Sequence, residues 1–403
     1  MNTERLYYAD AYCADFAGRV LAARDEGGRL AVALDRTAFY PTGGGQPNDT
    51  GRLFTASGSA DVVDVTSEDG LVWHWLAAGA APADWPTGAA VTAAVDWPRR
   101  FDHMQQHTGQ HILSQAFIET CAAETVAFHL GAAYSTIDLS RTDLDAAAVA
   151  AAEVAANRVI DRALPVTAEY VTPDELAALP LRRAPKVTED IRIVQVAGFD
   201  WSACGGTHVA NSSQVGLVKI SAVERRGGEL RVTFLCGGRA RADYARLHAL
   251  AQGLVARFTT GQDEILAAVD RRAAEAEALR KELADLERQW VEATAAALWA
   301  GAEPRASYRV VARALDAPAE RVKHVAQALK ARERTVVLLA ARGERPQVFC
   351  TRSDDLAVDA AAVLRAAVTA GGGRGGGRPD WAQGGVPSAE ALDTALQAGT
   401  STL

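Results

Sequence analysis

Cysteine is scarce in this chain of 403 residues, and the few cysteines are widely scattered. An odd number of distant thiols does not form the dense paired framework on which small secreted domains depend. We therefore expect buried free thiols, with one thiol available as a metal ligand. The cysteines are Cys13, Cys121, Cys204, Cys236 and Cys350.

Long apolar runs are also missing. No stretch approaches the roughly 20 apolar residues that a membrane-spanning helix needs. The N-terminal segment MNTERLYYAD lacks the basic start, apolar core and cleavage site of a secretory signal. The composition, 49% hydrophobic and 23% charged, is that of a soluble globular protein with room for two to four domains. We expect a cytoplasmic protein without a membrane partner.

The chain has no excess of positive charge, since its formal net charge is −8. It is therefore not a nucleic-acid binder that works through overall charge, and any contact with RNA would come from local basic segments. The candidate segments are RRF (99–101), LRRAPK (181–186) and GGGRGGGRP (371–379).

The patterns along the chain predict an α+β protein of several domains. Residues 1–95 alternate short apolar runs with turn residues, which predicts a small β-barrel that contains the glycine-rich loop TAFYPTGGGQPNDTG. Helical and strand patterns mix over 96–245, as in an α+β domain. Residues 246–300 have the pattern of one long helix. Residues 301–403 have that of a compact α/β unit, in which GGGRGGGRPDWAQGG is expected to be a loop.

Apolar residues recur along the predicted long helix at alternating spacings of four and three. Two interpretations stay open. The helix could pack against its own chain, or it could pair with a second copy as a two-stranded coiled coil and form a homodimer. The repeating residues are Ile265, Val269, Ala276, Leu279, Leu283, Leu286 and Trp290.

Three histidines repeat at intervals of four in HMQQHTGQHILSQAF, namely His103, His107 and His111. On a helix, His107 and His111 share one face and can present two imidazoles to one ion. Zinc peptidases place a glutamate general base between two such histidines, but this chain has only TGQ there. The missing glutamate argues against metal-assisted peptide hydrolysis of that type.

A second pair, Cys204 and His208, stands four residues apart in SACGGTHV. The two intervening glycines disfavour a helix, so we expect a tight turn between strands. One thiolate and three imidazoles, from His107, His111, Cys204 and His208, are a ligand set that suits Zn²⁺. His103 lies one helical turn before His107 and could be a ligand instead, but the two helical histidines and the Cys204–His208 pair already fill four positions, so we interpret it as a neighbour of the site or a surface residue.

Six segments in order resemble the alanyl-tRNA editing proteins, the AlaX family in its long form, which is related to the editing and C-terminal domains of alanyl-tRNA synthetase. The last segment resembles the DHH-associated C-terminal domain of the longer members. The segments are TAFYPTGGGQPNDTG (37–51), HMQQHTGQHILSQAF (103–117), FHLGAAYSTIDL (128–139), DWSACGGTHVANSSQVG (200–216), RVTFLCGGRA (231–240) and GGGRGGGRPDWAQGG (371–385).

The resemblance implies hydrolysis of the ester bond in mischarged tRNA(Ala), chiefly Ser-tRNA(Ala) and also Gly-tRNA(Ala). It assigns Zn²⁺ to the four residues named above and implies that the C-terminal domain binds tRNA. The synthetases begin with an ATP-dependent aminoacylation domain, for which this sequence leaves no room before the barrel. We therefore expect editing without aminoacylation, and we assign no residue as general base.

The remaining candidates would contact the amino acid or the RNA. The glycine-rich barrel loop could offer backbone amides to the acceptor end, and a histidine in the following domain could form a pocket wall. Two arginines among C-terminal glycines could bind the tRNA backbone. A tight turn, an ordinary strand histidine and a flexible surface loop are the structural alternatives. These residues are Gly43, Gly44, Gly45, Gln46, His129, Arg374 and Arg378.

Two other functions stay open. One is a non-catalytic tRNA-binding protein with a structural zinc ion, and the other is a zinc hydrolase for a small ester or amide. The missing glutamate counts against peptides. The barrel, the long helix and the Gly/Arg segment favour a large substrate over a small one.

Overall fold

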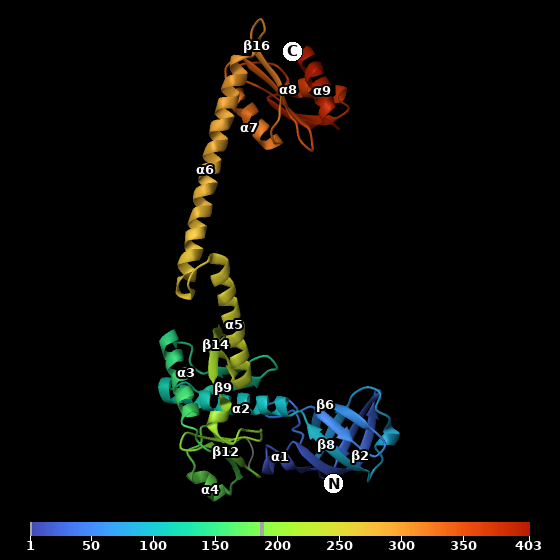
Figure 1. Cartoon of the computed structure of the whole chain (residues 1–403), viewed down its shortest axis with the longest axis vertical. Coiled ribbons are helices and arrows are strands. Elements are labelled where there is room, and N and C mark those ends of the chain that lie inside the picture. Colours follow the sequence, from blue (N-terminus) through green and yellow to red (C-terminus); the bar gives the residue numbers. More distant parts are fainter. Residues whose placement is uncertain (1, 186–188) are drawn as a thin grey trace. The chain divides into compact units, whose positions relative to one another are not determined.

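The computed structural model describes residues 2–185 and 189–403 (Figure 1). The chain divides into two compact units, one ending at Gly253 and the other beginning at Leu254. Lys186, the last residue of the basic segment LRRAPK, lies outside the described residues. Among those described, no helix is both long and apolar enough to cross a membrane.

The N-terminal unit begins with a closed six-stranded barrel, which confirms the predicted barrel (Figure 1). Buried and exposed residues alternate along its strands. In β6, for example, Ala60 and Val62 are buried, whereas Ser59, Asp61 and Val63 are exposed. Around the barrel the strands are β2 (Asp15–Glu26), β3 (Arg29–Leu34), β7 (Leu71–Leu76), β6 (Ser59–Glu68), β5 (Gly51–Phe54) and β8 (Ala90–Val95).

Short elements flank the barrel strands. β1 (Glu4–Arg5) pairs in parallel with β4 (Arg36–Thr37), and the single turn α1 (Leu6–Ala9) follows β1. A 3₁₀ turn, η1 (Pro82–Asp84), precedes β8.

The glycine-rich segment after β4 is a loop, as predicted. A bridge between Gly43 and Gln46 closes its tight turn, and Gly44 and Gly45 have φ values of 54° and 81°, which favour glycine. A Cβ on Gly45 would lie 2.5 Å from the ring of Phe128. Glycine therefore allows this barrel loop to lie directly against the next domain.

Helix α2 (Trp97–Cys121) leads out of the barrel. Asp96 caps its first turn by accepting a hydrogen bond from the N–H of Arg99 at 3.3 Å. The helix ends at Ala122, whose left-handed φ of 48° cannot continue it.

Two antiparallel sheets and three short helical elements complete this part of the unit. One sheet has the order β14 (Val218–Arg226), β15 (Glu229–Cys236), β10 (Ser135–Leu139) and β9 (Thr125–Leu130). The other has the order β11 (Val166–Tyr170), β12 (Arg192–Val196) and β13 (Asp200–Ala203). The helical elements are α3 (Ala146–Asp161), α4 (Pro173–Ala178) and η2 (Ser212–Val215).

A buried ion pair joins the barrel to α2. The fully buried Arg100 donates from Nε to the two carboxylate oxygens of Asp49 at 3.1 and 3.0 Å, and from Nη1 to the carbonyl of Ala11 at 2.8 Å. The carboxylate of Asp49 also accepts the N–H of Tyr40 at 2.6 Å. Removing one partner of such a buried pair costs roughly 3–5 kcal/mol, so it holds the start of α2 against the barrel.

The predicted single helix over 246–300 is two helices in the structure. Helix α5 (Gly237–Phe258) ends at Thr259, whose φ is 51°, and a 3₁₀ turn, η3 (Gln262–Glu264), precedes α6 (Ile265–Ala300). The left-handed residue and Gly261 break the helix. Helix α6 nevertheless keeps the predicted apolar residues: Leu279 is 64% exposed, and Leu283 and Leu286 are each 54% exposed.

The C-terminal unit contains a six-stranded sheet in which only β17 and β18 pair in parallel. In order, its strands are β16 (Glu303–Pro304), β17 (Arg309–Leu315), β18 (Thr335–Ala341), β19 (Gln347–Arg352), β21 (Trp381–Gly385) and β20 (Arg374–Arg378). Its helices are α7 (Ala319–Lys330), α8 (Ala360–Ala370) and α9 (Ala389–Ser401).

The glycine-rich segment of this unit is not the loop that the sequence predicted. Residues 374–378 form the edge strand β20, which pairs antiparallel with β21 from Arg374↔Gly385 to Arg378↔Trp381. A Cβ on Gly375 would lie 2.5 Å from the Cα of Gly384. The missing side chains therefore allow the backbones to pair closely. The N–H groups of β20 that face β21 are used in the hydrogen bonds of the sheet.

Candidate metal centre

The middle of α2 is buried although most of its side chains are polar. Gln106, His107 and Thr108 are fully shielded, while Gln110 is 1% and His111 is 3% exposed. Buried polar groups are costly unless they are hydrogen-bonded or bind an ion, so this helix requires partners. They come from the barrel loop, from β13 and from the segment after β13.

The structure brings together the four predicted ligands. One donor atom from each of His107, His111, Cys204 and His208 lies within 4.8 Å of all the others. The Sγ atom of Cys204 is 3.4 Å from Nε2 of His107 and 3.4 Å from Nε2 of His208. Donor atoms around a tetrahedral ion at normal bond lengths lie roughly 3.3–3.7 Å apart, so this donor set could hold a metal ion.

Each imidazole is held in place through its other nitrogen. Nδ1 of His107 lies 2.8 Å from Oε1 of Gln46, and Nδ1 of His111 lies 3.0 Å from a carboxylate oxygen of Asp200. Because both oxygens can only accept, these Nδ1 atoms carry the proton and Nε2 stays free for a metal. Nδ1 of His208 lies 3.1 Å from the hydroxyl of Thr108.

The charges favour a deprotonated thiol beside the imidazoles. Burial alone would raise the pKa of Cys204, but the adjacent His107 and His208 hold it well below its ordinary value. Burial, together with His107, lowers the pKa of His208 to about 3. A thiolate with a neutral imidazole is the protonation state that binds a metal.

His111 differs from the other candidate ligands because its imidazole pairs with a carboxylate, that of Asp200. Burial alone would lower the pKa of His111, but Asp200 and Cys204 raise it. Asp200 is held in turn by the guanidinium of Arg182 at 3.2 Å and by the hydroxyl of Ser202 at 2.9 Å. This carboxylate is fully engaged, and it orients the metal ligand next to it.

Comparisons with known proteins agree with this site. The family described as tRNA synthetases class II (A) matches residues 8–99, and the DHHA1 domain matches residues 307–403. The Threonyl and Alanyl tRNA synthetase second additional domain matches residues 191–232, a range that includes Cys204 and His208.

One relative matches this chain over nearly its whole length. The alanyl-tRNA editing protein AlaX-L of Pyrococcus horikoshii is 29% identical over 405 residues, which cover 98% of this chain and 98% of that protein. The chain is thus similar to an AlaX protein over nearly the whole length of both chains. The chain also matches the alanine–tRNA ligase of Pyrobaculum neutrophilum with 35% identity. The match covers 95% of this chain but only 42% of that enzyme.

The present chain also matches a solved C-Ala domain of Aquifex aeolicus alanyl-tRNA synthetase at 24% identity, and the match covers 24% of this chain and 91% of the solved one. Its TM-score of 0.22 is too low to support a statement about the fold.

The barrel loop of this chain reaches the candidate metal centre. Oε1 of Gln46 accepts from both His107 and the N–H of Thr207, the latter at 3.1 Å, while Nε2 donates to the Thr207 hydroxyl at 2.8 Å. Gln46 therefore supports a ligand, a role that the sequence did not suggest. The glycines before it, Gly43 to Gly45, reach β9 beside the site, where the N–H of Leu130 donates to the carbonyl of Gly45 at 3.3 Å.

The structure does not bring the other predicted residues into the group of four candidate ligands. His129 is exposed on β9, next in sequence to Phe128, whose ring centroid lies 5.9 Å from that of His107. Neighbouring residues of a strand point to opposite faces, so His129 points away from the ligands and its role stays a prediction. Arg374 and Arg378 are exposed on β20 in the other unit, and their contact with tRNA also stays a prediction.

His103 is not among the four grouped donors, and its interpretation as a neighbour of the site stays a prediction. It is 3% exposed, and burial, together with nearby arginines, lowers its pKa to about 4. The sequence analysis missed Asp200 and Thr108. Both lie within four residues of a predicted ligand. A histidine that binds a metal through one ring nitrogen usually needs a hydrogen-bond partner for the other nitrogen, and this rule was the signal that could have found them.

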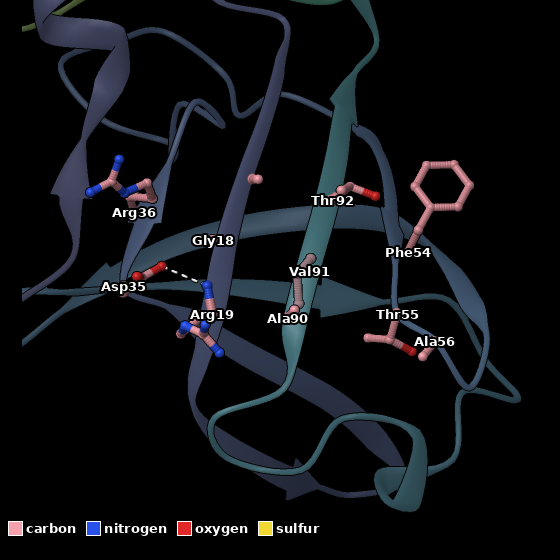
Figure 2. Close-up of a pocket in the computed structure, with 11 residues that line it drawn as sticks. Gly18, Arg19, Asp35, Arg36, Phe54, Thr55, Ala56, Ala90, Val91 and Thr92 are labelled. Atoms are coloured by element: carbon pink, nitrogen blue, oxygen red, sulfur yellow. Dashed lines mark hydrogen bonds between the residues drawn. The ribbon is translucent and has the colours of Figure 1, made fainter.

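A separate hollow of about 470 Å³ lies on the barrel surface (Figure 2). Its cations already have partners: Arg36 pairs with Glu4 at 3.2 Å, and Arg19 donates to the carbonyl of Gly88 at 3.2 Å. Asp35 accepts the backbone N–H of Arg19 at 2.7 Å. The hollow shares no residue with the metal centre.

Proposed function

We propose that this chain is a zinc-dependent hydrolase that deacylates mischarged tRNA(Ala), chiefly Ser-tRNA(Ala) and also Gly-tRNA(Ala). The observation that carries the proposal is the set of four donor atoms within 4.8 Å of one another, at the positions that the AlaX resemblance assigns. The printed name of the Pyrococcus horikoshii relative, an alanyl-tRNA editing protein, supports the substrate class.

The donor chemistry favours Zn²⁺. Sites with one thiolate and three imidazoles are typical of zinc, and His107, His111, Cys204 and His208 would hold the ion. When bound, zinc supplies a Lewis acid that polarises an ester carbonyl or lowers the pKa of water.

The protein's own residues prepare that site. Gln46, Asp200 and Thr108 fix the three imidazole rings, so little reorganisation is needed when substrate binds. Asp200 cannot move a proton freely, because His111, Arg182 and Ser202 all engage it. The site thus lacks the free carboxylate base of zinc peptidases, which suits an activated aminoacyl ester better than an amide.

An apolar pocket rejects an added hydroxyl poorly. Selection of serine over alanine therefore requires a polar group that stays without a hydrogen-bond partner unless the serine hydroxyl binds to it. Gln110 is such a group. It is 1% exposed and follows His107 by three residues, so both lie on one helix face. Its Nε2 donates to Ser114 at 2.8 Å, whereas its Oε1 has no hydrogen-bond partner among the described residues. A serine hydroxyl donated to Oε1 would satisfy it.

The direct test is release of amino acid from Ser-tRNA(Ala), Gly-tRNA(Ala) and Ala-tRNA(Ala) by the purified protein. We expect fast release of serine, slower release of glycine and little release of alanine. No release above the rate without protein would refute the enzyme proposal. Gln110→Met should reduce the ratio of kcat/KM for Ser- over Ala-tRNA(Ala), and an unchanged ratio would remove Gln110 from the specificity proposal.

A non-catalytic tRNA-binding protein with structural zinc is the second candidate. The observation that favours it is that the protein itself offers four donors, as closed structural zinc sites do. Cys204→Ala distinguishes the two functions. Loss of zinc together with deacylation supports the enzyme, whereas tight binding of Ser-tRNA(Ala) by the wild type without turnover supports the second candidate.

A further inference from the structure

A pocket of about 570 Å³ adjoins the metal-ligand segment. It lies between the residues that precede the barrel and β11. Of the four ligands, Cys204 is the only one partly exposed, and a Cβ on the next residue, Gly205, would lie 3.6 Å from the hydroxyl of Tyr8 in the pocket. The pocket therefore lies one residue from a metal ligand. Its lining is Arg5, Tyr8, Ala9, Ala168 and Tyr170.

Two tyrosines form the walls of this pocket. The ring centroids of Tyr8 and Tyr170 are 6.3 Å apart, with the rings nearly perpendicular at 88°. Tyr170 is 54% exposed, a large aromatic surface for a residue beside a buried metal centre. Exposed aromatic faces are the platforms on which unpaired nucleobases stack, each stack contributing roughly 1–3 kcal/mol.

Two arginines supply positive charge to the same place. The guanidinium carbons of Arg5 and Arg192 lie 5.8 and 5.4 Å from the centroid of the Tyr8 ring. Within residues 2–185 and 189–403, neither guanidinium has a carboxylate oxygen within 4.0 Å. The hydrogen bonds that Arg5 donates to side chains of the described residues go to neutral groups, the hydroxyls of Tyr8 at 3.3 Å and Ser67 at 2.9 Å.

Arg192 also has an unused donor. It is 7% exposed, and its Nη1 donates to the carbonyls of Cys204 and Gly206, each at 3.0 Å. Its Nε has no hydrogen-bond partner among the described residues. Because a buried cation is costly without nearby acceptors or anions, Arg192 favours a negatively charged group close to the Tyr8 ring.

We propose that this pocket binds the terminal nucleotide of the RNA substrate, with the base against Tyr8 and Tyr170 and the 5′ phosphate paired with Arg5. The inference rests on the proposed function, because it places the aminoacyl-bearing ribose at Gly205, beside the metal ligand Cys204. Arg192, whose guanidinium lies over the Tyr8 ring, adds positive charge next to the pocket. A nucleotide has the two properties that this lining requires, a planar ring and an anion.

The first test separates stacking from folding. Tyr170→Ala should raise KM for Ser-tRNA(Ala) by roughly 5- to 100-fold, the value of one lost stack, with kcat and zinc content unchanged. Tyr170→Phe should restore KM. Tyr244→Ala is the matched control, because Tyr244 is an exposed tyrosine (68%) on α5, outside the pocket. An unchanged KM in Tyr170→Ala overturns the proposal.

The second test uses small probes on the full chain and does not depend on turnover. Adenosine 5′-monophosphate should bind in a calorimeter more tightly than ribose 5-phosphate, and Tyr170→Ala should remove the difference. Arg5→Gln should lower the salt dependence of tRNA binding by roughly one phosphate contact, whereas Arg5→Lys and the control Arg52→Gln should not.

The outcomes of this test distinguish the two proposals. Serine release with equal affinity for the two probes overturns the pocket and leaves the hydrolase standing. Probe binding that depends on Tyr170, without release of any amino acid, supports the pocket and refutes the hydrolase.

Discussion

Nδ1 of His111 lies 3.0 Å from a carboxylate oxygen of Asp200, and both side chains are almost fully buried. This contact sets the orientation of the imidazole and leaves Nε2 directed toward the other three ligands. Burial alone would raise the pKa of Asp200, but His111 and Arg182 hold it below its ordinary value, so the carboxylate stays ionised at neutral pH.

Asp200→Asn should lower zinc affinity by roughly 10- to 100-fold, because an amide can present the same shape without the charge that supports His111. Competition with a chromophoric chelator measures the affinity. Asp138→Asn is the control, since Asp138 is also a largely buried carboxylate paired with an arginine, Arg231 at 2.7 Å. Equal losses in both variants would show that Asp200 has no specific role at the metal.

Two adjacent glycines provide a sharper test of the site. A Cβ on Gly206 would lie 2.2 Å from Cε1 of His107 and 2.9 Å from Oε1 of Gln46, whereas a Cβ on Gly205 meets only the Tyr8 hydroxyl at 3.6 Å. Gly206→Ala should therefore displace His107 and lose bound zinc, and Gly205→Ala should retain it. Metal content after gel filtration measures both. Full zinc occupancy in Gly206→Ala would contradict the assignment of His107.

Acid should destabilise the barrel through His74. This side chain is fully buried between Thr37 and the carbonyl of Val32, and burial lowers its pKa from 6.5 to about 4. Between these values the unfolded chain binds a proton that the folded barrel does not, so stability falls as the pH falls from about 6.5 to 4. The free energy of unfolding decreases by roughly 3 kcal/mol over this pH range.

Urea unfolding at pH 7 and pH 4.5 measures this loss. His74→Gln should flatten the dependence, and His248→Gln, an exposed position on α5, should leave it unchanged. The pKa of His103 is also lowered to about 4, so the flattening should be partial. An identical pH dependence in His74→Gln and wild type would exclude His74 as a contributor.

The exposed apolar residues of α6 favour a homodimer, which we propose forms through this helix. Pairing two such helices would remove Leu279, Leu283 and Leu286 from water, each contributing about 1–2 kcal/mol. Sedimentation equilibrium should show a dimer that Leu283→Asp dissociates. Glu282→Asp, on the charged face, is the control. A monomer at all concentrations would refute the pairing.

The grouping of the four candidate ligands could be predicted because their chemistry is visible in the residue types: two histidines on one helix face, and a thiol with a histidine four residues later. A need for hydrogen-bond partners could also be foreseen, but not which residue pairs with which imidazole. Gln46 reaches His107 from 61 positions away, and Asp200 reaches His111 from 89 positions away. Such pairings depend on how the barrel and the sheets pack, which local spacing does not encode.

Secondary structure was misread where glycine or a single turn decided it. Glycine has low strand propensity, so residues 374–378 favoured a loop, yet the lack of side chains is what allows β20 to pair closely with β21. The apolar periodicity of 246–300 continues across Thr259 and Gly261, and it concealed the break that these residues impose.

Gln46 has a consequence for how this protein can be divided. A fragment starting at residue 96 would retain all four candidate ligands, but the imidazole of His107 would lose its hydrogen bond to Gln46 and Arg100 would lose its counter-charge. The barrel is thus a structural component of the candidate metal site rather than an appended module. Transplanting the metal-binding domain into another protein would require the barrel to travel with it.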